Sequence, residues 1–217
     1  MKVQLVKITT IFTIMLIGCG QEKKEQPVTL KSEKSINPKV QEEFAVISTQ
    51  FGDMVIEFYK RAAPKHVESF KLHVKNGFYD GTIFHRVIPG FMIQGGDPNT
   101  KGEDVMSYGM GGHAAKFYGF GDESNMNSWK LPAEFNDIKH TKGILSMARS
   151  NDKNSAGSQF FICDGNPSHL DAQYTVFGKV IEGLDIIEKI AGLPRDNRNN
   201  PLKKIKMKIK LKPKTNK

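Results

Sequence analysis

The groups that could do chemistry in this chain are one arginine, two amides and several large apolar side chains. Strand alternation places Met92 and Gln94 on one face of a segment that follows Arg86. The same alternation places Gln159 and Phe161 on one face of a later segment. We therefore predict that these five residues line one groove, with a cation and amides beside an apolar wall.

Covalent and metal-dependent chemistry are not indicated. No Ser or Cys nucleophile lies beside a His base in a recognisable turn, and no paired carboxylates are evident. The six histidines lack metal-ligand spacing, and we interpret His66 and His73 as an exposed pair on one helix. The run Gly109–Gly112 lacks the Lys-Ser/Thr of a phosphate loop. We expect no metal and no cofactor.

The net charge of +9 over 217 residues is concentrated at the ends of the chain. Residues 44–202 carry 17 basic and 18 acidic groups, whereas residues 203–217 carry eight lysines and no acid. A neutral body argues against a broad phosphate-binding face, so we expect no nucleic-acid partner. Nothing in the sequence favours an oligomer, and we expect a monomer.

The N-terminus has the pattern of an export signal. Two lysines precede the apolar run 8–17, which is shorter than the roughly 20 residues of a membrane-spanning helix. The run ends in Leu16-Ile17-Gly18-Cys19, which resembles the bacterial lipobox, so Cys19 is the predicted site of lipidation. The alternative is an ordinary signal peptide with a chance cysteine. With Cys19 lipidated, Cys163 would have no disulfide partner.

These patterns divide the chain into three parts. Residues 1–18 are the predicted lipoprotein signal peptide, and residues 19–43 are the lipidated cysteine with a disordered, charged tether. Residues 44–213 are the predicted folded domain. The expected location is the bacterial cell envelope, with the exported protein anchored by its lipid and facing the periplasm or the cell surface.

Short alternating segments in the body predict an antiparallel sheet. Residues 44–59 are typical of a hairpin around Gly52-Asp53 with a two-residue turn. Helices are predicted over 64–75, with Pro64 at the first helical position, and over 184–190. Further strands are predicted at 83–87, 91–94, 143–148, 159–163, 174–180 and 204–212. The lysines of the last segment indicate either a solvated strand face or a patch for anionic lipid or nucleic acid.

Several long motifs in order resemble the cyclophilin family of peptidyl-prolyl cis-trans isomerases. They are Phe84–Asp97, Gly143–Ala148, Gly157–Ile162 and Thr175–Val180, within a similarity that spans about 45–212. The resemblance implies a mainly β fold, a closed eight-stranded antiparallel barrel capped by two α-helices. It also implies proline-containing polypeptides as substrates, and hence a peptidyl-prolyl cis-trans isomerase (rotamase) that assists folding of exported proteins.

The resemblance also assigns roles to individual residues. Arg86, Gln94 and Phe91 would be catalytic. The substrate-binding residues would be Met92, Ala148, Arg149, Gln159, Phe161, His169, Leu170 and Tyr174. Three of these depart from the common family pattern: His169 stands where many members have Trp, Tyr174 where they have His, and Arg149 where they have Asn. The change at His169 leaves sensitivity to cyclosporin open.

Two questions stay open at the level of sequence. The segment 96–130 is longer than in compact family members, and is either a lid or docking surface or a loop packed on the barrel. A chaperone-like binding module with little turnover is the alternative to an isomerase. Arg86 favours the isomerase, because a fixed cation can stabilise the twisted X-Pro amide better than the planar one.

Overall fold

The computed structural model describes residues 42–214. The predicted signal peptide, Cys19 and nearly all of the predicted tether lie outside the described residues. The strands are β1 Glu43–Thr49, β2 Gly52–Phe58, β3 Arg86–Ile88, β4 Met92–Gly95, β5 Ile144–Met147, β6 Phe160–Cys163, β7 Val176–Glu182 and β8 Lys208–Pro213. The α-helices are α1 Pro64–Lys75 and α2 Leu184–Ala191, and four short 3-10 helices lie at Pro98–Lys101, Val105–Ser107, Met126–Ser128 and Ser168–Leu170. Within 42–214, no helix combines the length and the apolar character needed to cross a bilayer.

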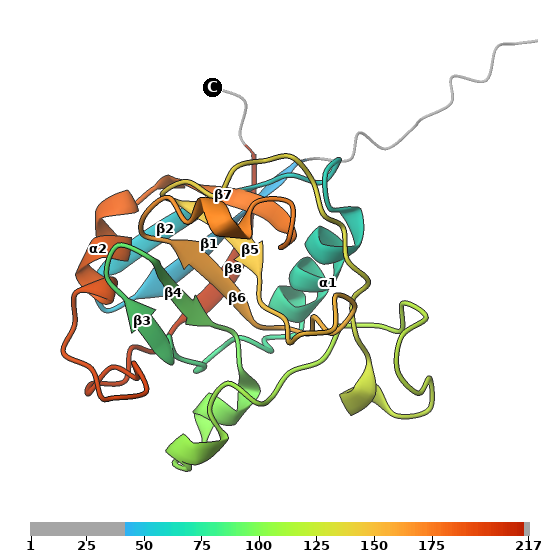
Figure 1. Cartoon of the computed structure of the whole chain (residues 1–217), viewed down its shortest axis with the longest axis horizontal. Coiled ribbons are helices and arrows are strands. Elements are labelled where there is room, and N and C mark those ends of the chain that lie inside the picture. Colours follow the sequence, from blue (N-terminus) through green and yellow to red (C-terminus); the bar gives the residue numbers. More distant parts are fainter. Residues whose placement is uncertain (1–41, 215–217) are drawn as a thin grey trace, which may run out of the picture. The chain divides into compact units, whose positions relative to one another are not determined.

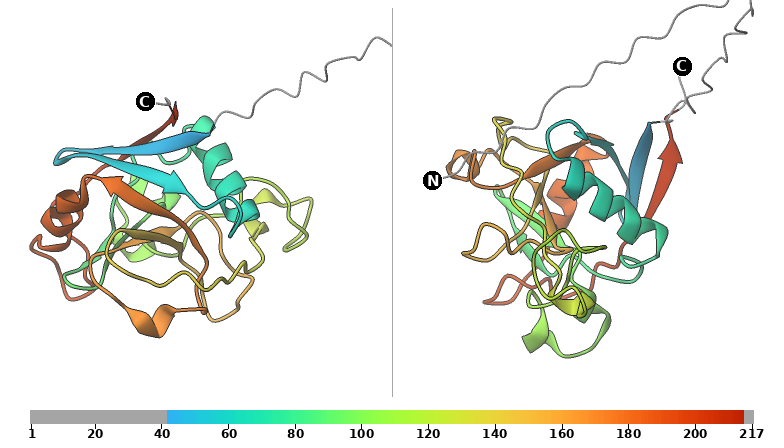
Figure 2. Two further views of the ribbon diagram at one scale, coloured as in Figure 1. Left: turned by 90° about the horizontal axis from the view of Figure 1, so that it is seen from above. Right: turned by 90° about the vertical axis from the view of Figure 1, so that its right-hand side faces the viewer.

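The eight strands form one antiparallel sheet in the order β3-β4-β6-β5-β7-β2-β1-β8, curved around a core and accompanied by the two α-helices (Figure 1, Figure 2). The prediction of a closed barrel is wrong: β3 and β8 are edges, and the sheet is an open half-barrel. The reason lies in the short β3. The backbone N–H of Val87 donates to the carbonyl oxygen of Asn199 in the loop between α2 and β8. Residues 81–84 and 205–207 meet outside β3 and β8, through three backbone hydrogen bonds and the isolated bridge of Ile83 with Lys206.

The first hairpin forms where the alternation predicts it, with a different turn. Thr49 pairs with Gly52, so the turn residues are Gln50 and Phe51 rather than Gly52-Asp53. Gly52 is the first residue of β2 and has φ +122°, a conformation that residues with a Cβ rarely adopt.

Helix α1 begins at Pro64 and buries Val67, Phe70 and Val74, as its spacing predicts. The interpretation of His66 and His73 as an exposed pair is wrong, because they are only 1% and 3% exposed. Ring nitrogens of the two histidines lie 2.7 Å from Glu134 Oε2 and 2.8 Å from the His113 carbonyl oxygen, respectively. Residues from the long middle segment and the chain just after it therefore cover the helix.

The core has two apolar clusters, and the smaller one underlies the candidate site. The larger cluster includes Phe70, Phe160 and Phe177. The smaller cluster contains Met92, Ile144, Phe161, Cys163, Leu170 and Val176. Phe160 and Phe161 are adjacent in β6 and belong to different clusters because successive strand residues point to opposite faces. Cys163 is a free buried thiol, and burial raises its pKa to about 12.

Candidate active site

The register of β3 and β4 brings Arg86 and Gln94 together. They are directly opposed in the ladder, and Arg86 Nη1 donates to Gln94 Oε1 at 3.3 Å. The turn between the two strands places the ring of Phe91 5.9 Å from the Arg86 guanidinium carbon. Gly90 in this turn has φ +71°. A short hairpin thus holds a cation, an amide and an aromatic ring in one cluster.

Strand β6 supplies the apolar floor next to this cluster. Phe161 pairs with Gln94, and Met92 pairs with Cys163. The cavity that results has a volume of about 200 Å³, the size of a small side chain rather than of a large ligand. Its lining is Arg86, Phe91, Met92, Gln94, Ala148, Arg149, Phe161, Leu170 and Tyr174, nine of the eleven residues predicted for the site.

His140 supports the floor from behind, a role that the sequence did not suggest. Its ring stacks on Phe161, with the centroids 6.0 Å apart and the planes at 15°. Its Nδ1 lies 3.1 Å from Asp171 Oδ1, and its Nε2 lies 3.1 Å from Ser146 Oγ. Burial lowers the pKa of His140, while the backbone N–H of His140 lowers the pKa of Asp171. We expect a neutral imidazole that fixes the Phe161 ring.

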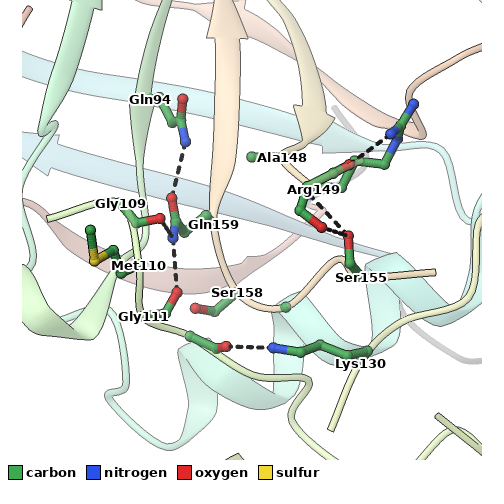
Figure 3. A pocket seen from close by; sticks show the side chains of 13 residues that line it. Gln94, Gly109, Met110, Gly111, Lys130, Ala148, Arg149, Ser155, Ser158 and Gln159 are labelled. Atoms are coloured by element: carbon green, nitrogen blue, oxygen red, sulfur yellow. Dashed lines mark hydrogen bonds between the residues drawn. The ribbon is translucent and has the colours of Figure 1, made fainter. Parts of the chain in front are cut away.

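The two remaining predicted residues lie at the margins. Gln159 lines a neighbouring cavity of about 280 Å³ instead of the smaller one. Its Nε2 donates to the carbonyl oxygens of Gly109 and Gly111 at 2.9 and 2.8 Å, and its Oε1 accepts from Gln94 at 3.0 Å (Figure 3). His169 is exposed, and its ring centroid lies 5.8 Å from that of Phe91.

Arg149 and Tyr174 form the opposite rim. The Arg149 guanidinium carbon lies 4.4 Å from the centroid of the Tyr174 ring, and its nitrogens donate to the carbonyl oxygens of Gln173 and Ser150. The Tyr174 ring meets Phe161 edge-on at 5.9 Å. The Arg149 guanidinium is thereby held against Tyr174.

The second cavity is lined by Ala148, Arg149 and Gln159, which the resemblance places among the substrate-binding residues, and also by Lys130 and Met110, which sequence reasoning missed. Its wall includes the backbone carbonyls of Gly109 and Gly111, which accept from Gln159, and of Gly112, which accepts from Lys130. Side-chain periodicity carries no signal for such carbonyls. Lys130 and Met110 belong to the long segment to which the sequence assigned no single role.

Comparison with known proteins agrees with this geometry. The profile of the family described as "Cyclophilin type peptidyl-prolyl cis-trans isomerase/CLD" matches residues 44–210. The chain belongs to the cyclophilin family. The cyclophilin fold and peptidyl-prolyl cis-trans isomerase activity that the motifs predict are thus confirmed, apart from the closure of the barrel.

Curated relatives of this cyclophilin carry the same activity in their names. The chain is 41% identical over 158 residues to a peptidyl-prolyl cis-trans isomerase of Acinetobacter baylyi, an alignment that covers 68% of this chain and 71% of the relative. It is also 41% identical over 153 residues to a probable peptidyl-prolyl cis-trans isomerase of Brucella abortus, covering 69% and 71% of the two chains.

A solved structure supports the fold. The cyclophilin type peptidyl-prolyl cis-trans isomerase of Cryptosporidium parvum, crystallised in the presence of the dipeptide Ala-Pro, is similar with a TM-score of 0.66 and 31% identity. The alignment covers 80% of this chain and 99% of that one.

The cyclophilin site contains no metal centre among residues 42–214, where no three His, Cys, Asp or Glu side chains are grouped to hold an ion. The nearest titratable neighbour of Arg86 along the chain is His85, which is 3% exposed, with neither ring nitrogen hydrogen-bonded. Burial lowers the pKa of His85 to about 4, so this ring is neutral at physiological pH. Arg86 is therefore the only cation of the Arg86–Gln94–Phe91 cluster.

Proposed function

We propose that this cyclophilin isomerises X-Pro bonds through the Arg86 guanidinium, with Gln94 as its positioning partner and Phe91 beside it. One observation carries the proposal: a fixed cation and an amide stand at the rim of an apolar cavity sized for a proline ring. Ala148, Arg149 and Tyr174 complete the rim, Met92, Phe161 and Leu170 the wall. Gln159 and His169 contact the bound chain outside this cavity.

The chemical task is rotation about an amide bond. The barrier is about 18–20 kcal/mol because rotation breaks amide resonance. In the twisted state the prolyl nitrogen loses conjugation and becomes a better hydrogen-bond acceptor. A guanidinium that donates more strongly to that state than to the planar one lowers the barrier, and each 1.36 kcal/mol corresponds to about tenfold in rate.

Arginine suits this task for two physical reasons. It stays charged at all physiological pH values, and its planar fork presents donors in fixed directions. The apolar wall holds the proline ring and limits access of water, so that water competes less for the amide. No covalent bond forms, and no proton needs to move.

The test is an isomerisation assay on a proline peptide with wild type and Arg86→Ala. We expect Arg86→Ala to remove most of the catalysed rate while circular dichroism and the thermal midpoint stay close to wild type. An unchanged rate in the folded variant would reject the role of Arg86.

The proposed setting is the bacterial cell envelope, where the enzyme would assist folding of exported proteins as a lipid-anchored monomer. Support comes from the sequence: the basic start, the apolar run 8–17 and the Gly18-Cys19 pair. Growth with labelled palmitate should label wild type and leave Cys19→Ser unlabelled. Recovery of both proteins, unlabelled, in the soluble fraction would reject the anchor.

A further inference from the structure

The backbone on both sides of Arg86 is held by one loop, the residues between α2 and β8. Asn200 Nδ2 donates to the carbonyl oxygen of His85, and the N–H of Val87 donates to the carbonyl oxygen of Asn199 at 2.9 Å. The His85 carbonyl belongs to the peptide group before Arg86, and the Val87 N–H belongs to the peptide group after it. Two adjacent residues of the loop therefore bind the two peptide groups that flank Arg86.

These two contacts restrain the direction of the Arg86 side chain. Each peptide group is planar, so the backbone conformation of Arg86 is the relative orientation of its two flanking peptide planes. That orientation sets the direction of the Cα–Cβ bond, and hence the point from which the guanidinium reaches into the groove. On the other side, β4 holds the same residue through its pairing with Gln94. Because β3 has only three residues, each contact with a neighbouring segment supplies a large share of its restraint.

The Asn199–Asn200 corner is itself held in place by Asp196. One carboxylate oxygen, Oδ1, accepts from the backbone N–H groups of Arg198 and Asn200 at 2.9 and 2.8 Å. The Asp196 carbonyl accepts from the Asn199 N–H and the Asp196 N–H donates to the Asn200 carbonyl, both at 2.9 Å. Asn199 has φ +65°, a conformation in which asparagine is more common than most residues. A closed turn therefore presents the Asn200 amide to β3 from a defined place.

The side chain at position 200 must meet two requirements. It must carry a donor, because the group it meets is a carbonyl oxygen. It must also be short, because the backbone of residue 200 is paired with Asp196 and cannot retreat to make room. Asparagine satisfies both, whereas an ionised aspartate of the same shape would offer only acceptors. Asn200 is half-buried, so water competes only partly for this hydrogen bond.

We propose that Asn200 is a positioning residue for catalysis: its amide, together with the Asn199 carbonyl, holds the Arg86 backbone in the conformation from which the guanidinium meets the twisted amide. The inference rests on the proposed function, because the role of Arg86 makes the direction of its side chain matter for the rate. Asn200 does not line the proline pocket, so its effect on the reaction passes through Arg86. A small misplacement of a catalytic group slows the chemical step, while the apolar wall that binds proline stays in place.

The experiment measures kcat and KM of the full chain with one proline peptide, in wild type and in Asn200→Ala. We expect kcat to fall about tenfold and KM to change less than about twofold. Asp196→Ala loosens the same corner without changing the Asn200 side chain, and should give the same split between kcat and KM.

Asn136→Ala is the matched control. The Asn136 amide also donates to backbone carbonyl oxygens, those of Glu134 and Val176, at 3.1 and 2.9 Å. Val176 begins β7, which is separated from β3 by β5, β6 and β4. This variant should lower the thermal midpoint and leave kcat unchanged.

A double-mutant cycle with Arg86 separates positioning from a general loss of structure. In the Arg86→Ala background, measured at high enzyme concentration, adding Asn200→Ala should lower the residual rate less than about twofold, because no guanidinium is left to misplace. The inference would be overturned by a loss as large as in wild type, or by a wild-type kcat in folded Asn200→Ala. If Asn200→Ala does not fold, Asp196→Ala decides by the same two criteria. Failure of the proposed function shows differently, as an undiminished rate of Arg86→Ala itself.

Discussion

Arg86 and Gln94 face each other across the β3–β4 ladder, and the amide of Gln94 connects the guanidinium on one side to Gln159 on the other. Gln159 in turn is held by the carbonyl oxygens of Gly109 and Gly111. This chain of hydrogen bonds runs from the proposed catalytic cation to the wall of the second cavity. Gln94 is therefore a positioning residue for Arg86 as well as a group that faces substrate.

Gln94→Ala should slow catalysis without preventing binding. The substitution removes the acceptor at 3.3 Å from Arg86 Nη1 and frees the guanidinium to take other rotamers. We expect kcat to fall about tenfold, corresponding to a loss of about 1.4 kcal/mol of transition-state stabilisation, with KM changed less than threefold. Gln50→Ala in the first hairpin turn is the control. A larger effect on KM than on kcat would show that Gln94 serves mainly to grip substrate.

Phe161→Leu should weaken substrate binding through loss of the aromatic floor. Phe161 is 5% exposed and belongs to the smaller cluster, below the cavity. We expect KM to rise several-fold and stability to fall by about 1–2 kcal/mol. Phe160→Leu, one residue earlier and in the larger cluster, should lower stability by a similar amount and leave KM unchanged. Equal effects on KM would contradict the division of β6 into two faces.

Acid should destabilise the fold through two buried histidines. Burial lowers the pKa of His73 and of His85 from 6.5 to about 4. Between pH 4 and pH 6.5 the unfolded chain binds more protons than the folded chain, because its histidines are protonated first. The free energy of unfolding is therefore highest above pH 6.5 and falls as the pH is lowered toward 4. The loss amounts to about 3 kcal/mol for each histidine. Urea unfolding from pH 7 to pH 4.5 measures it, and His73→Phe should reduce the pH dependence by the share of His73, leaving the shares of His85 and His140. If the free energy of unfolding of His73→Phe depended on pH as steeply as that of wild type, His73 would not contribute to the acid sensitivity.

Gly165→Ala should disturb the turn that carries Phe91. A Cβ at residue 165 would lie too close to the carbonyl oxygen of Gly90 for the backbone to stay in place. The adjacent Asp164 accepts from the Gly90 N–H at 2.7 Å, so the two loops move together. We expect a lower thermal midpoint and a higher KM. Gly81→Ala is the comparison variant. A Cβ at residue 81 would contact nothing within 4 Å, but the backbone there has φ +81°, so this variant should lower the thermal midpoint and leave KM unchanged. An unchanged KM in Gly165→Ala would show that the turn is adaptable.

The groove was predictable from the sequence because strand alternation places Met92 with Gln94, and Phe161 on the facing strand. The family motifs extended this to Leu170 and Tyr174. The burial of His66 and His73 was not predictable, since their covering groups, Glu134 and His113, lie 68 and 40 residues further along the chain. The spacing of apolar residues along a helix shows which face of that helix is apolar. It does not show which distant segments cover the other faces.

Closure of the sheet was mispredicted for a similar reason. Alternating lysines identify β8 as a strand, yet they do not show what pairs with its outer edge. Asn199 takes the hydrogen bond of Val87, and the backbone contacts between 81–84 and 205–207 lie outside β3 and β8. In the second cavity, the contributions of the backbone near Gly111 and of Lys130 escaped prediction, because side-chain patterns say nothing of backbone carbonyls and Lys130 lies 36 residues after Gln94.

In the proposed mechanism, Arg86 stabilises the twisted amide rather than the planar amide of the bound peptide. Exchange spectroscopy by NMR on a saturating proline peptide measures the cis-trans rate on the enzyme and the Kd in one sample. We predict that Arg86→Ala slows bound-state exchange by about a hundredfold or more, roughly 2.7 kcal/mol, and changes Kd by less than about threefold. A variant whose Kd rises a hundredfold while exchange in the bound state stays as fast as in wild type would contradict it.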